Sequence, residues 1–488
     1  MKKIIAAVLT VVILFTAVLL FSSLLKSSSQ DAKYSAYFDA PERYEIVFLG
    51  SSHVIMGALP LELWKDYGFS SYNLGNYSEP LQASYWLLRF ILEKDRPGLV
   101  VLDPYPIFED ADFSYPNSEM MHGLFEQLPF SRLKLEAIED MFTEELKEEY
   151  CFPLSYYHSR WKDIDKTDFD RANESFYYGQ GSDESAFYGT PTSVIIRPYE
   201  SEGPVDSKEV ERTDTLGKQY LRKIIELCRD TDTRLLLALT PLLAYDDEMR
   251  WVNSAVEIAR EYGVPVLNGI GAGIVDPKTD MFDYGHLNSS GARKWTAVLG
   301  KYISENFDLP VYTQGETADF WAKEYYEKYI PYKSGRISSQ NMLYNYLMLC
   351  ADKNFSVCLY IPSGSAVFSD GESIDLIRNL SPVELTRLSS SSRDGGSYLC
   401  FIDNPGETVT ELSGDGLSER ISTSFGEVDF TENILYINGE QTADWFDHSP
   451  NGINKIQFCI AVIDNYSGSV IDTSWFFRTE YGVYASIG

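Results

Sequence analysis

Short apolar runs that alternate with helix-like segments most strongly constrain the fold of this chain. Most of these runs are rich in strand-forming side chains, and the segments between them carry apolar residues at helical spacing, as at Leu81, Tyr85 and Leu88. Strands that alternate with helices pair in parallel and need helices on both faces of their sheet. The sequence therefore predicts an α/β fold with a doubly wound parallel sheet. The runs are residues 45–49, 71–75, 99–102, 235–239 and 264–268.

This alternation is interrupted once and ends before the C-terminus, which divides the chain. An acidic, tyrosine-rich insertion separates the two halves of the α/β pattern, and strand-like runs with hairpin signals such as Asn438-Gly439 dominate the last third. We therefore expect a C-terminal β-rich module of the α+β or β-sandwich type. The expected parts are an α/β domain over 42–307 (core 42–105 and 213–307, insertion 106–212), a linker helix within 308–336 and a module over 337–488.

An uncharged apolar stretch near the N-terminus indicates a membrane anchor. Lys2 and Lys3 precede residues 4–25, which as a helix would span about 33 Å, enough for a bilayer core of about 30 Å. Because lysines favour the cytoplasmic side, the rest of the chain is expected to be extracytoplasmic, at the cell membrane, after a polar stalk over 26–41. The competing interpretation is a cleaved signal peptide, which is usually shorter in its apolar region and ends at a small-residue cleavage site.

The net charge of -31 excludes some partners. Such an acidic surface repels nucleic acid, so no nucleic-acid partner is expected. The six cysteines form no Cys-x-x-Cys pair, and no cluster of His, Cys, Asp and Glu has the spacing of metal ligands. We therefore expect neither a metal site nor a cofactor.

The first apolar run ends in a turn that could hold a nucleophile. Residues 46–49 lead into Gly50, Ser51, Ser52 and His53. Ligands of open α/β sheets bind at the carboxyl ends of the strands, so a serine at this position is a candidate nucleophile. Small polar residues after a strand also serve simply as turn formers, and the turn alone does not distinguish these two interpretations.

A carboxylate and an imidazole follow the last run of the α/β pattern. Asp283 and His286 are three residues apart, a spacing that places both side chains on one side of a turn. A carboxylate beside an imidazole selects its tautomer and stabilises the imidazolium, so His286 could act as the general base for a serine. The alternative is an unrelated Asp and His in a surface loop.

Together these segments resemble the sequence blocks of the SGNH/GDSL hydrolase superfamily. Gly50-Ser51-Ser52-His53, Asn73-Leu74-Gly75 and Asp283-x-x-His286 correspond to three of its blocks, whereas Asp103-Pro104-Tyr105 stands in place of Gly-x-Asn-Asp. The resemblance implies Ser52 as nucleophile, with Asp283 and His286 as its partners. It also implies an oxyanion hole that includes the backbone N–H groups of Ser52 and Gly75, with Asn73 and Asn76 as candidates for the missing asparagine.

Within that superfamily, the chain is similar to the membrane-anchored branch that transfers D-alanyl groups to lipoteichoic acid or acetylates exported polysaccharides. The resemblance implies acyl transfer or hydrolysis on a cell-envelope glycopolymer, beside a membrane-bound O-acyltransferase. In the C-terminal module, three short motifs weakly resemble the interleukin-like epithelial–mesenchymal-transition inducer domain, a non-catalytic module. They are Gly452-Ile453-Asn454, Val462-Ile463-Asp464 and Gly468-Ser469-Val470-Ile471-Asp472. The alternative function is a non-catalytic glycan-binding or scaffold protein on a degenerate SGNH fold.

Overall fold

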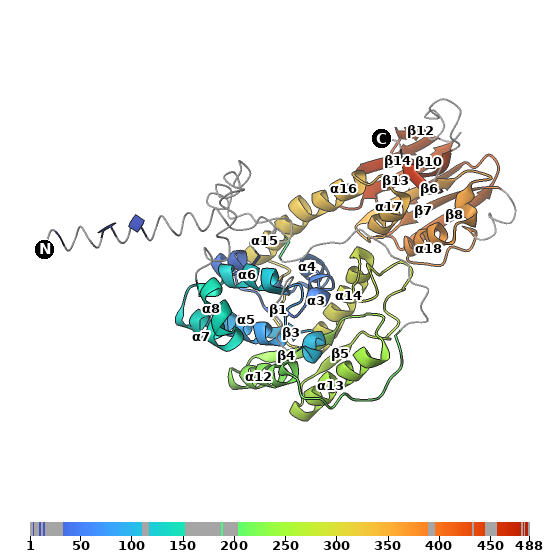
Figure 1. Cartoon of the computed structure of the whole chain (residues 1–488). Coiled ribbons are helices and arrows are strands. Elements are labelled where there is room, and N and C mark those ends of the chain that lie inside the picture. The colour runs from blue at the N-terminus through green and yellow to red at the C-terminus, as the bar shows by residue number, and fades with distance from the viewer. Residues whose placement is uncertain are drawn as a thin grey trace.

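The molecule consists of an α/β part and a C-terminal β-rich part, joined by one long helical segment (Figure 1). The computed structural model describes residues 33–109, 117–151, 187–188, 204–388, 396–431, 434–444, 456–479, 482 and 484–486, with residues 3, 9, 10, 13 and 14 near the N-terminus.

A five-stranded parallel sheet forms the centre of the α/β part. Its strand order is β2-β1-β3-β4-β5, and every neighbouring pair is parallel, as the alternating pattern predicts. After β1 the chain adds β2 on one side and later β3 on the other, so the order reverses at β1. Ligands of such sheets bind where the order reverses, at the carboxyl ends of the strands. The strands are β1 (Ile46–Leu49), β2 (Ser71–Asn73), β3 (Leu99–Leu102), β4 (Arg234–Leu239) and β5 (Val266–Asn268).

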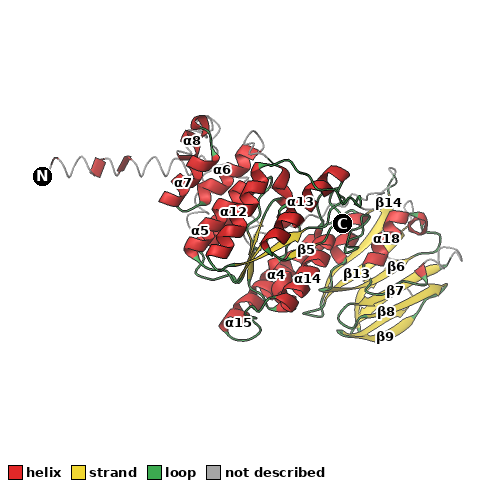
Figure 2. Cartoon of the chain, turned by 90° about the horizontal axis from the view of Figure 1, so that it is seen from below, coloured by secondary structure: helices red, strands yellow, loops and turns green. Residues whose placement is uncertain are grey.

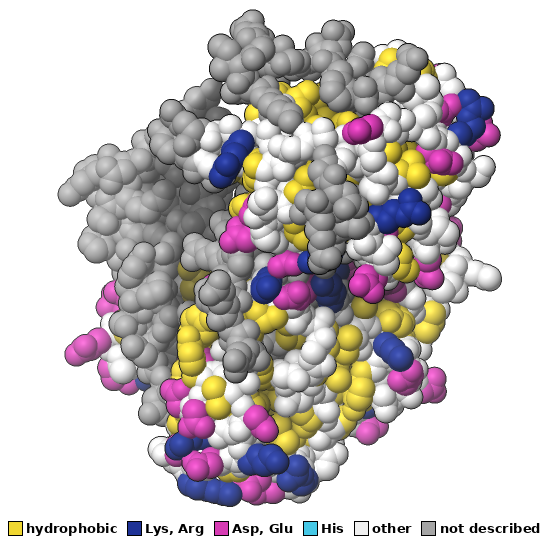
Figure 3. Space-filling model, turned by 90° about the vertical axis from the view of Figure 1, so that its right-hand side faces the viewer, with side chains coloured by type: hydrophobic (Ala, Val, Ile, Leu, Met, Phe, Trp, Pro, Cys, Tyr) yellow, Lys and Arg dark blue, Asp and Glu magenta, His cyan; other side chains and the backbone are white. Residues whose placement is uncertain are grey.

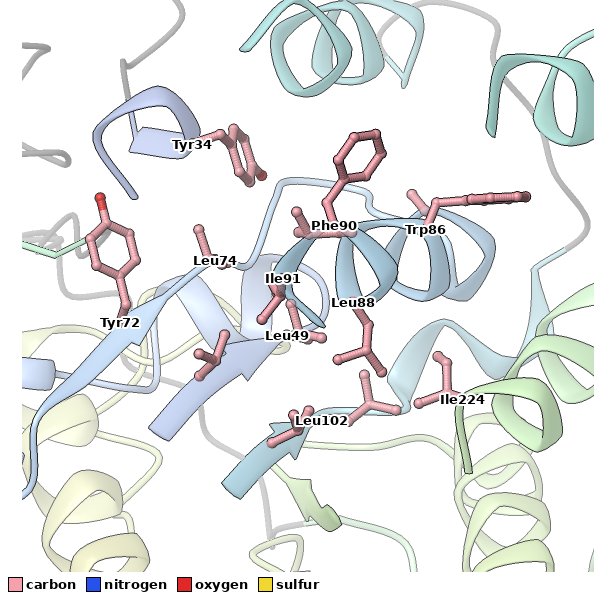
Figure 4. Packing of buried hydrophobic residues seen from close by; sticks show 14 of the residues in the cluster. Tyr34, Leu49, Tyr72, Leu74, Trp86, Leu88, Phe90, Ile91, Leu102 and Ile224 are labelled. Atoms are coloured by element: carbon pink, nitrogen blue, oxygen red, sulfur yellow. The ribbon is translucent and has the colours of Figure 1, made fainter. Parts of the chain in front are cut away.

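Helices cover both faces of this sheet. On one face Leu49 and Leu102 pack with Leu88 of α5 and Ile224 of α12 (Figure 4). On the other face the intervening strand residues pack against α4 and α14. Because successive strand residues point to opposite faces, burial of both faces explains why β1 and β3 are apolar throughout. The helices are α4 (Pro60–Tyr67), α5 (Leu81–Lys94), α12 (Leu216–Asp230), α13 (Asp246–Tyr262) and α14 (Ser289–Asn306).

The expected stalk over 26–41 needs correction from Lys33 onward. Residues Lys33–Asp39 form helix α2, in which Tyr34 and Tyr37 are buried against the α/β core. The Tyr72 hydroxyl donates to the backbone oxygen of Lys33 (2.8 Å), and the Tyr37 ring lies 5.2 Å from the Tyr72 ring. Tyrosine has a polar hydroxyl but buries a large apolar area, so a polar-looking segment such as this one can still pack on the core.

The membrane anchor expected over 4–25 lies almost entirely outside the described residues, as do residues 26–32 of the stalk. Across the part of the chain that is described, no helix combines the length and the apolar character that a membrane crossing requires.

The insertion begins as helices that pack on the α/β core. Its segments 110–116, 152–186 and 189–203 lie outside the described residues. The described helices are η1 (Tyr105–Phe108), α6 (Asn117–Gln127), α7 (Arg132–Met141) and α8 (Glu144–Cys151).

The linker helix occupies residues 316–338 and so extends past the expected end of the linker at residue 336. Three segments, α15 (Glu316–Lys323), the π-helical η3 (Glu324–Tyr329) and α16 (Ile330–Ser338), continue one another without a break. Pro331 has no N–H to donate, which normally interrupts a helix. Here the π turn ends just before the proline and absorbs the change in hydrogen-bond register.

The C-terminal part has three layers, consistent with the expected β-rich module (Figure 2). A six-stranded sheet, β15-β14-β13-β6-β7-β8, packs helices α17 (Leu343–Cys350) and α18 (Gly371–Asn379) on one face and the sheet β12-β11-β10-β9 on the other. All its strand pairs are antiparallel. The strands are β6 (Phe355–Ile361), β7 (Ser397–Asp403), β8 (Thr408–Gly414), β9 (Glu419–Thr423), β10 (Gly426–Thr431), β11 (Ile434–Ile437), β12 (Glu440–Asp444), β13 (Ile456–Asp464), β14 (Val470–Arg478) and β15 (Tyr484–Ser486).

Candidate active site

Ser52 lies at the turn between β1 and the short helix α3 (Ser52–Ile55). Gly50 takes a φ of 136°, and a Cβ there would approach the backbone oxygen of Asp103 to 2.9 Å. Only glycine accepts both the angle and the contact, so the chain can turn sharply at the end of β1. The turn buries Ser51, which is 4% exposed, and leaves Ser52 partly exposed. Of the two serines, Ser52 is thus the one whose hydroxyl a ligand can reach.

His286 and Asp283 meet Ser52 from the far end of the α/β sequence. The Ser52 Oγ lies 2.7 Å from the His286 Nε2, although 234 residues separate them. The His286 Nδ1 lies 2.8 Å from Oδ1 and 2.9 Å from Oδ2 of Asp283. The structure therefore brings the three residues that the sequence singled out into one hydrogen-bonded line.

A small hairpin gives the two partners their orientation. The backbone N–H groups of Gly285 and His286 both donate to the Asp283 Oδ1, each at 2.8 Å. The backbone N–H of Phe282 donates to the oxygen of His286 (2.8 Å), and Met281 pairs with Leu287. With the carboxylate accepting from Nδ1–H, the Nε2 lone pair faces the Ser52 hydroxyl, the arrangement in which an imidazole can accept the serine proton.

The residues expected at an oxyanion hole are engaged in other hydrogen bonds. Asn73 is fully buried, and its amide donates to the backbone oxygens of Val54 (2.8 Å) and Ala58 (2.9 Å). The Gly75 N–H donates to the Asn73 Oδ1 (3.1 Å). These bonds fix the loop after β2 against α3, so Asn73 supports the turn that carries the serine.

Asn76 is likewise bound to the protein. Its side-chain amide donates to the backbone oxygen of Met120 (3.2 Å), and its N–H donates to the oxygen of Gly50 (3.0 Å). The N–H of Ser52 differs, because the first residue of a helix has no acceptor within the helix. No acceptor for it occurs among the described residues. Among the expected oxyanion-hole donors, the Ser52 N–H is therefore the one that lies at the start of a helix and makes no hydrogen bond with the described residues.

A second histidine and a second carboxylate lie directly behind the line. His53 is 3% exposed, and its ring lies 5.2 Å from the His286 ring and 4.1 Å from the Tyr105 ring. Burial lowers the pKa of His53 to about 3, and the neighbouring His286 adds to the decrease. Its Nδ1 lies 4.0 Å from the Asp103 Oδ2. His53 is therefore uncharged at physiological pH, and its ring borders the site.

Asp103 joins the ends of two strands. Its carboxylate accepts from the N–H of Tyr105 (3.0 Å) and the N–H of Thr240 (3.2 Å), which follow β3 and β4. Burial raises the pKa of Asp103 to about 6, although these hydrogen bonds oppose the increase. Sequence reasoning assigned His53 and Asp103 no role in the site. Their positions directly after β1 and β3 were the available signal.

The geometry suits a serine nucleophile activated by an imidazole–carboxylate pair, the requirement for covalent acyl chemistry. Compared with known proteins, the chain matches no protein-family model and no curated protein sequence.

Proposed function

We propose that the chain is a membrane-anchored, extracytoplasmic serine acyltransferase or esterase that acts on cell-envelope glycopolymers. The hydrogen-bonded line from Ser52 through His286 to Asp283 carries this proposal. The strand order of the parallel sheet supports it, because Ser52 follows β1, where that order reverses. The resemblance of three sequence blocks to the SGNH superfamily supplies the reaction class.

The reaction would proceed through an acyl-enzyme on Ser52. As the Ser52 Oγ attacks the acyl carbonyl carbon, the His286 Nε2 accepts the hydroxyl proton and Asp283 stabilises the imidazolium. Collapse of the tetrahedral intermediate breaks the bond to the leaving oxygen, which receives the proton from His286. A sugar hydroxyl or water then gives its proton to His286 and attacks the acyl carbonyl carbon. Collapse of this second intermediate breaks the bond to the Ser52 Oγ, which takes the proton back from His286, and the acylated acceptor leaves. The choice of acceptor decides between transfer and hydrolysis.

The negative charge of the intermediate would be stabilised first by the backbone N–H of Ser52. This donor lies at the start of α3, and preorganised donors of this kind contribute strongly to acyl-transfer catalysis. The Gly75 N–H is the second donor, and it becomes available when the Gly75–Asn73 hydrogen bond opens. We propose that substrate binding opens this bond.

The substrate class and partner rest on the sequence. The uncharged stretch over 4–25 supports a single-pass anchor that would hold the site near the bilayer, where a membrane-bound O-acyltransferase could supply the acyl group. The net charge of -31 disfavours a strongly anionic acceptor. The face in Figure 3 nevertheless intersperses basic side chains with acidic and apolar ones, so local charge can differ from the net charge.

One observation favours a second candidate, a non-catalytic glycan-binding or scaffold protein on a degenerate SGNH fold. The amides of Asn73 and Asn76 are engaged with backbone oxygens, and Asp103 stands where the superfamily has its asparagine block. A site with only one unengaged donor would stabilise the tetrahedral intermediate of acyl transfer weakly.

Hydrolysis of p-nitrophenyl acetate by the purified full-length chain separates the two candidates. We expect turnover that falls by about 10⁴-fold in His286→Gln, because the general base and its carboxylate act as a unit with the nucleophile. Ser51→Ala is the matched control and should retain turnover, since the Ser51 hydroxyl makes no hydrogen bond with the described residues. Turnover that survives His286→Gln, or none in the parent, would favour the non-catalytic candidate.

A further inference from the structure

The C-terminal module contacts the base of the hairpin that carries Asp283 and His286. Helix α14, which follows this hairpin directly, lies on the side of the α/β part that faces the module (Figures 1 and 2). Helix α18 of the module ends there at Asn379. An ion pair at 3.4 Å joins Asp375 of α18 to Lys278, which lies at the start of the hairpin segment.

Four side chains close a ring of hydrogen bonds across this boundary. The Asn379 amide donates to the Ser290 Oγ (3.0 Å), and the Ser290 hydroxyl donates to the Asp280 Oδ1 (2.8 Å). The Lys294 ammonium donates to both Asp280 oxygens (2.9 and 2.7 Å) and to the Asn379 Oδ1 (2.8 Å). Asp280 is fully buried, so this carboxylate depends on its partners for compensation of its charge. Asn379 is the one member of the ring that the module supplies.

The ring continues into the hairpin through the backbone. The backbone oxygen of Asp280 accepts from the N–H of Asn288 (3.0 Å), and the Asn288 amide donates to the oxygen of Thr279 (2.9 Å). The Asn288 side-chain oxygen also caps α14. Asp280 and Asn288 thus form the base of the hairpin, and Asp283 and His286 lie at its tip. A shift of the base moves both side chains relative to Ser52.

We propose that Asn379 is a positioning residue for His286, so that the C-terminal module completes the candidate active site within the same chain. This inference rests on the proposed function for its effect on rate. Asn379 acts through Lys294 and Ser290 on Asp280, and through Asp280 on the hairpin. A small displacement of a catalytic base from its nucleophile reduces the rate by up to about 100-fold.

The test compares Asn379→Ala with Lys353→Ala in the purified full-length chain. Lys353 pairs with Asp66 of α4 and so joins the same two parts of the molecule away from the hairpin. We expect Asn379→Ala to lower kcat for p-nitrophenyl acetate by about 10- to 100-fold with KM nearly unchanged. Lys353→Ala should leave kcat unchanged.

A spectroscopic measurement decides the inference independently of turnover. In protein labelled with ¹⁵N-histidine, the ring signals of His286 are assigned by their loss in His286→Gln. We expect these signals to shift or broaden in Asn379→Ala and to stay in place in Lys353→Ala. Unchanged His286 signals in Asn379→Ala overturn the inference, and so does an unchanged kcat in an active parent. A parent without turnover would sink the proposed function alone, because the His286 signals still test the positioning role.

Discussion

Replacement of Glu79 by glutamine should stabilise the folded protein increasingly as the pH rises. Glu79 is fully buried, its Oε1 accepts from the Ser84 hydroxyl (2.6 Å), and its Oε2 has no partner among the described residues. Burial raises the pKa of Glu79 from 4.5 to about 8, although Ser84 and Lys33 oppose the increase. The folded protein therefore keeps this carboxyl group protonated at neutral pH, whereas the unfolded chain ionises it.

The size of the effect follows from the two pKa values. Ionisation favours the unfolded chain by about 1 kcal/mol at pH 5 and by about 4 kcal/mol at pH 8. Stability from this group is fully present below pH 4.5 and is lost as the pH rises toward 8. Glutamine keeps the acceptor for Ser84 and cannot ionise, so the variant should gain about 3 kcal/mol on the parent between pH 5 and pH 8.

Denaturant titrations of parent and variant at several pH values measure this gain. Other titrating groups are common to both proteins, so their contributions cancel in the difference. Glu93→Gln, at an exposed position of α5, is the matched control and should show no such trend. Parallel stability curves for the parent and Glu79→Gln would refute the reasoning, because they would mean that Glu79 ionises in the folded protein as easily as in the unfolded chain.

Three further substitutions test the site and the contact between the two parts. Gly50→Ala should cost about 1–3 kcal/mol in the free energy of unfolding, because alanine is strained at a φ of 136°, and calorimetry at matched pH measures the loss. Asp283→Asn should lower kcat by about 10⁴-fold in the ester assay, with the melting temperature nearly unchanged, because the amide favours the wrong imidazole tautomer. Lys333→Met should destabilise the protein by about 3–5 kcal/mol in denaturant titrations, because it leaves the buried carboxylates of Glu62 and Asp352 without this cation. Adding Glu62→Gln to Lys333→Met should recover part of that loss.

The parallel sheet was predictable because its strands are buried on both faces. Runs such as Leu99–Leu102 are apolar throughout, and helices lie between them in the sequence. The edge strands of the C-terminal part could not be predicted in this way, because they are not buried on both faces. Strands such as Glu419–Thr423 are half exposed and largely polar, so composition does not distinguish them from loops.

The roles of Ser52, Asp283 and His286 were assigned from residue type and from position after a strand. Both can be read from the local sequence. His53 and Asp103 also follow strands, but their proximity to each other depends on strand pairing. The register that sets Leu49 beside Leu102 places Gly50 against Asp103, and no local pattern carries that information. The hydrogen bond from the Gly75 N–H to the Asn73 Oδ1 could not be predicted either, because it forms only within the folded loop.

The most direct test of the central claim is the site at which a fluorophosphonate reacts with the full-length chain. Peptide mapping by mass spectrometry should place a single adduct on Ser52, because its Oγ lies 2.7 Å from the His286 imidazole. Ser52→Ala should abolish the adduct, and Ser51→Ala should leave it intact. An adduct that persists in Ser52→Ala, or a parent that does not react, would contradict the assignment of Ser52 as the nucleophile.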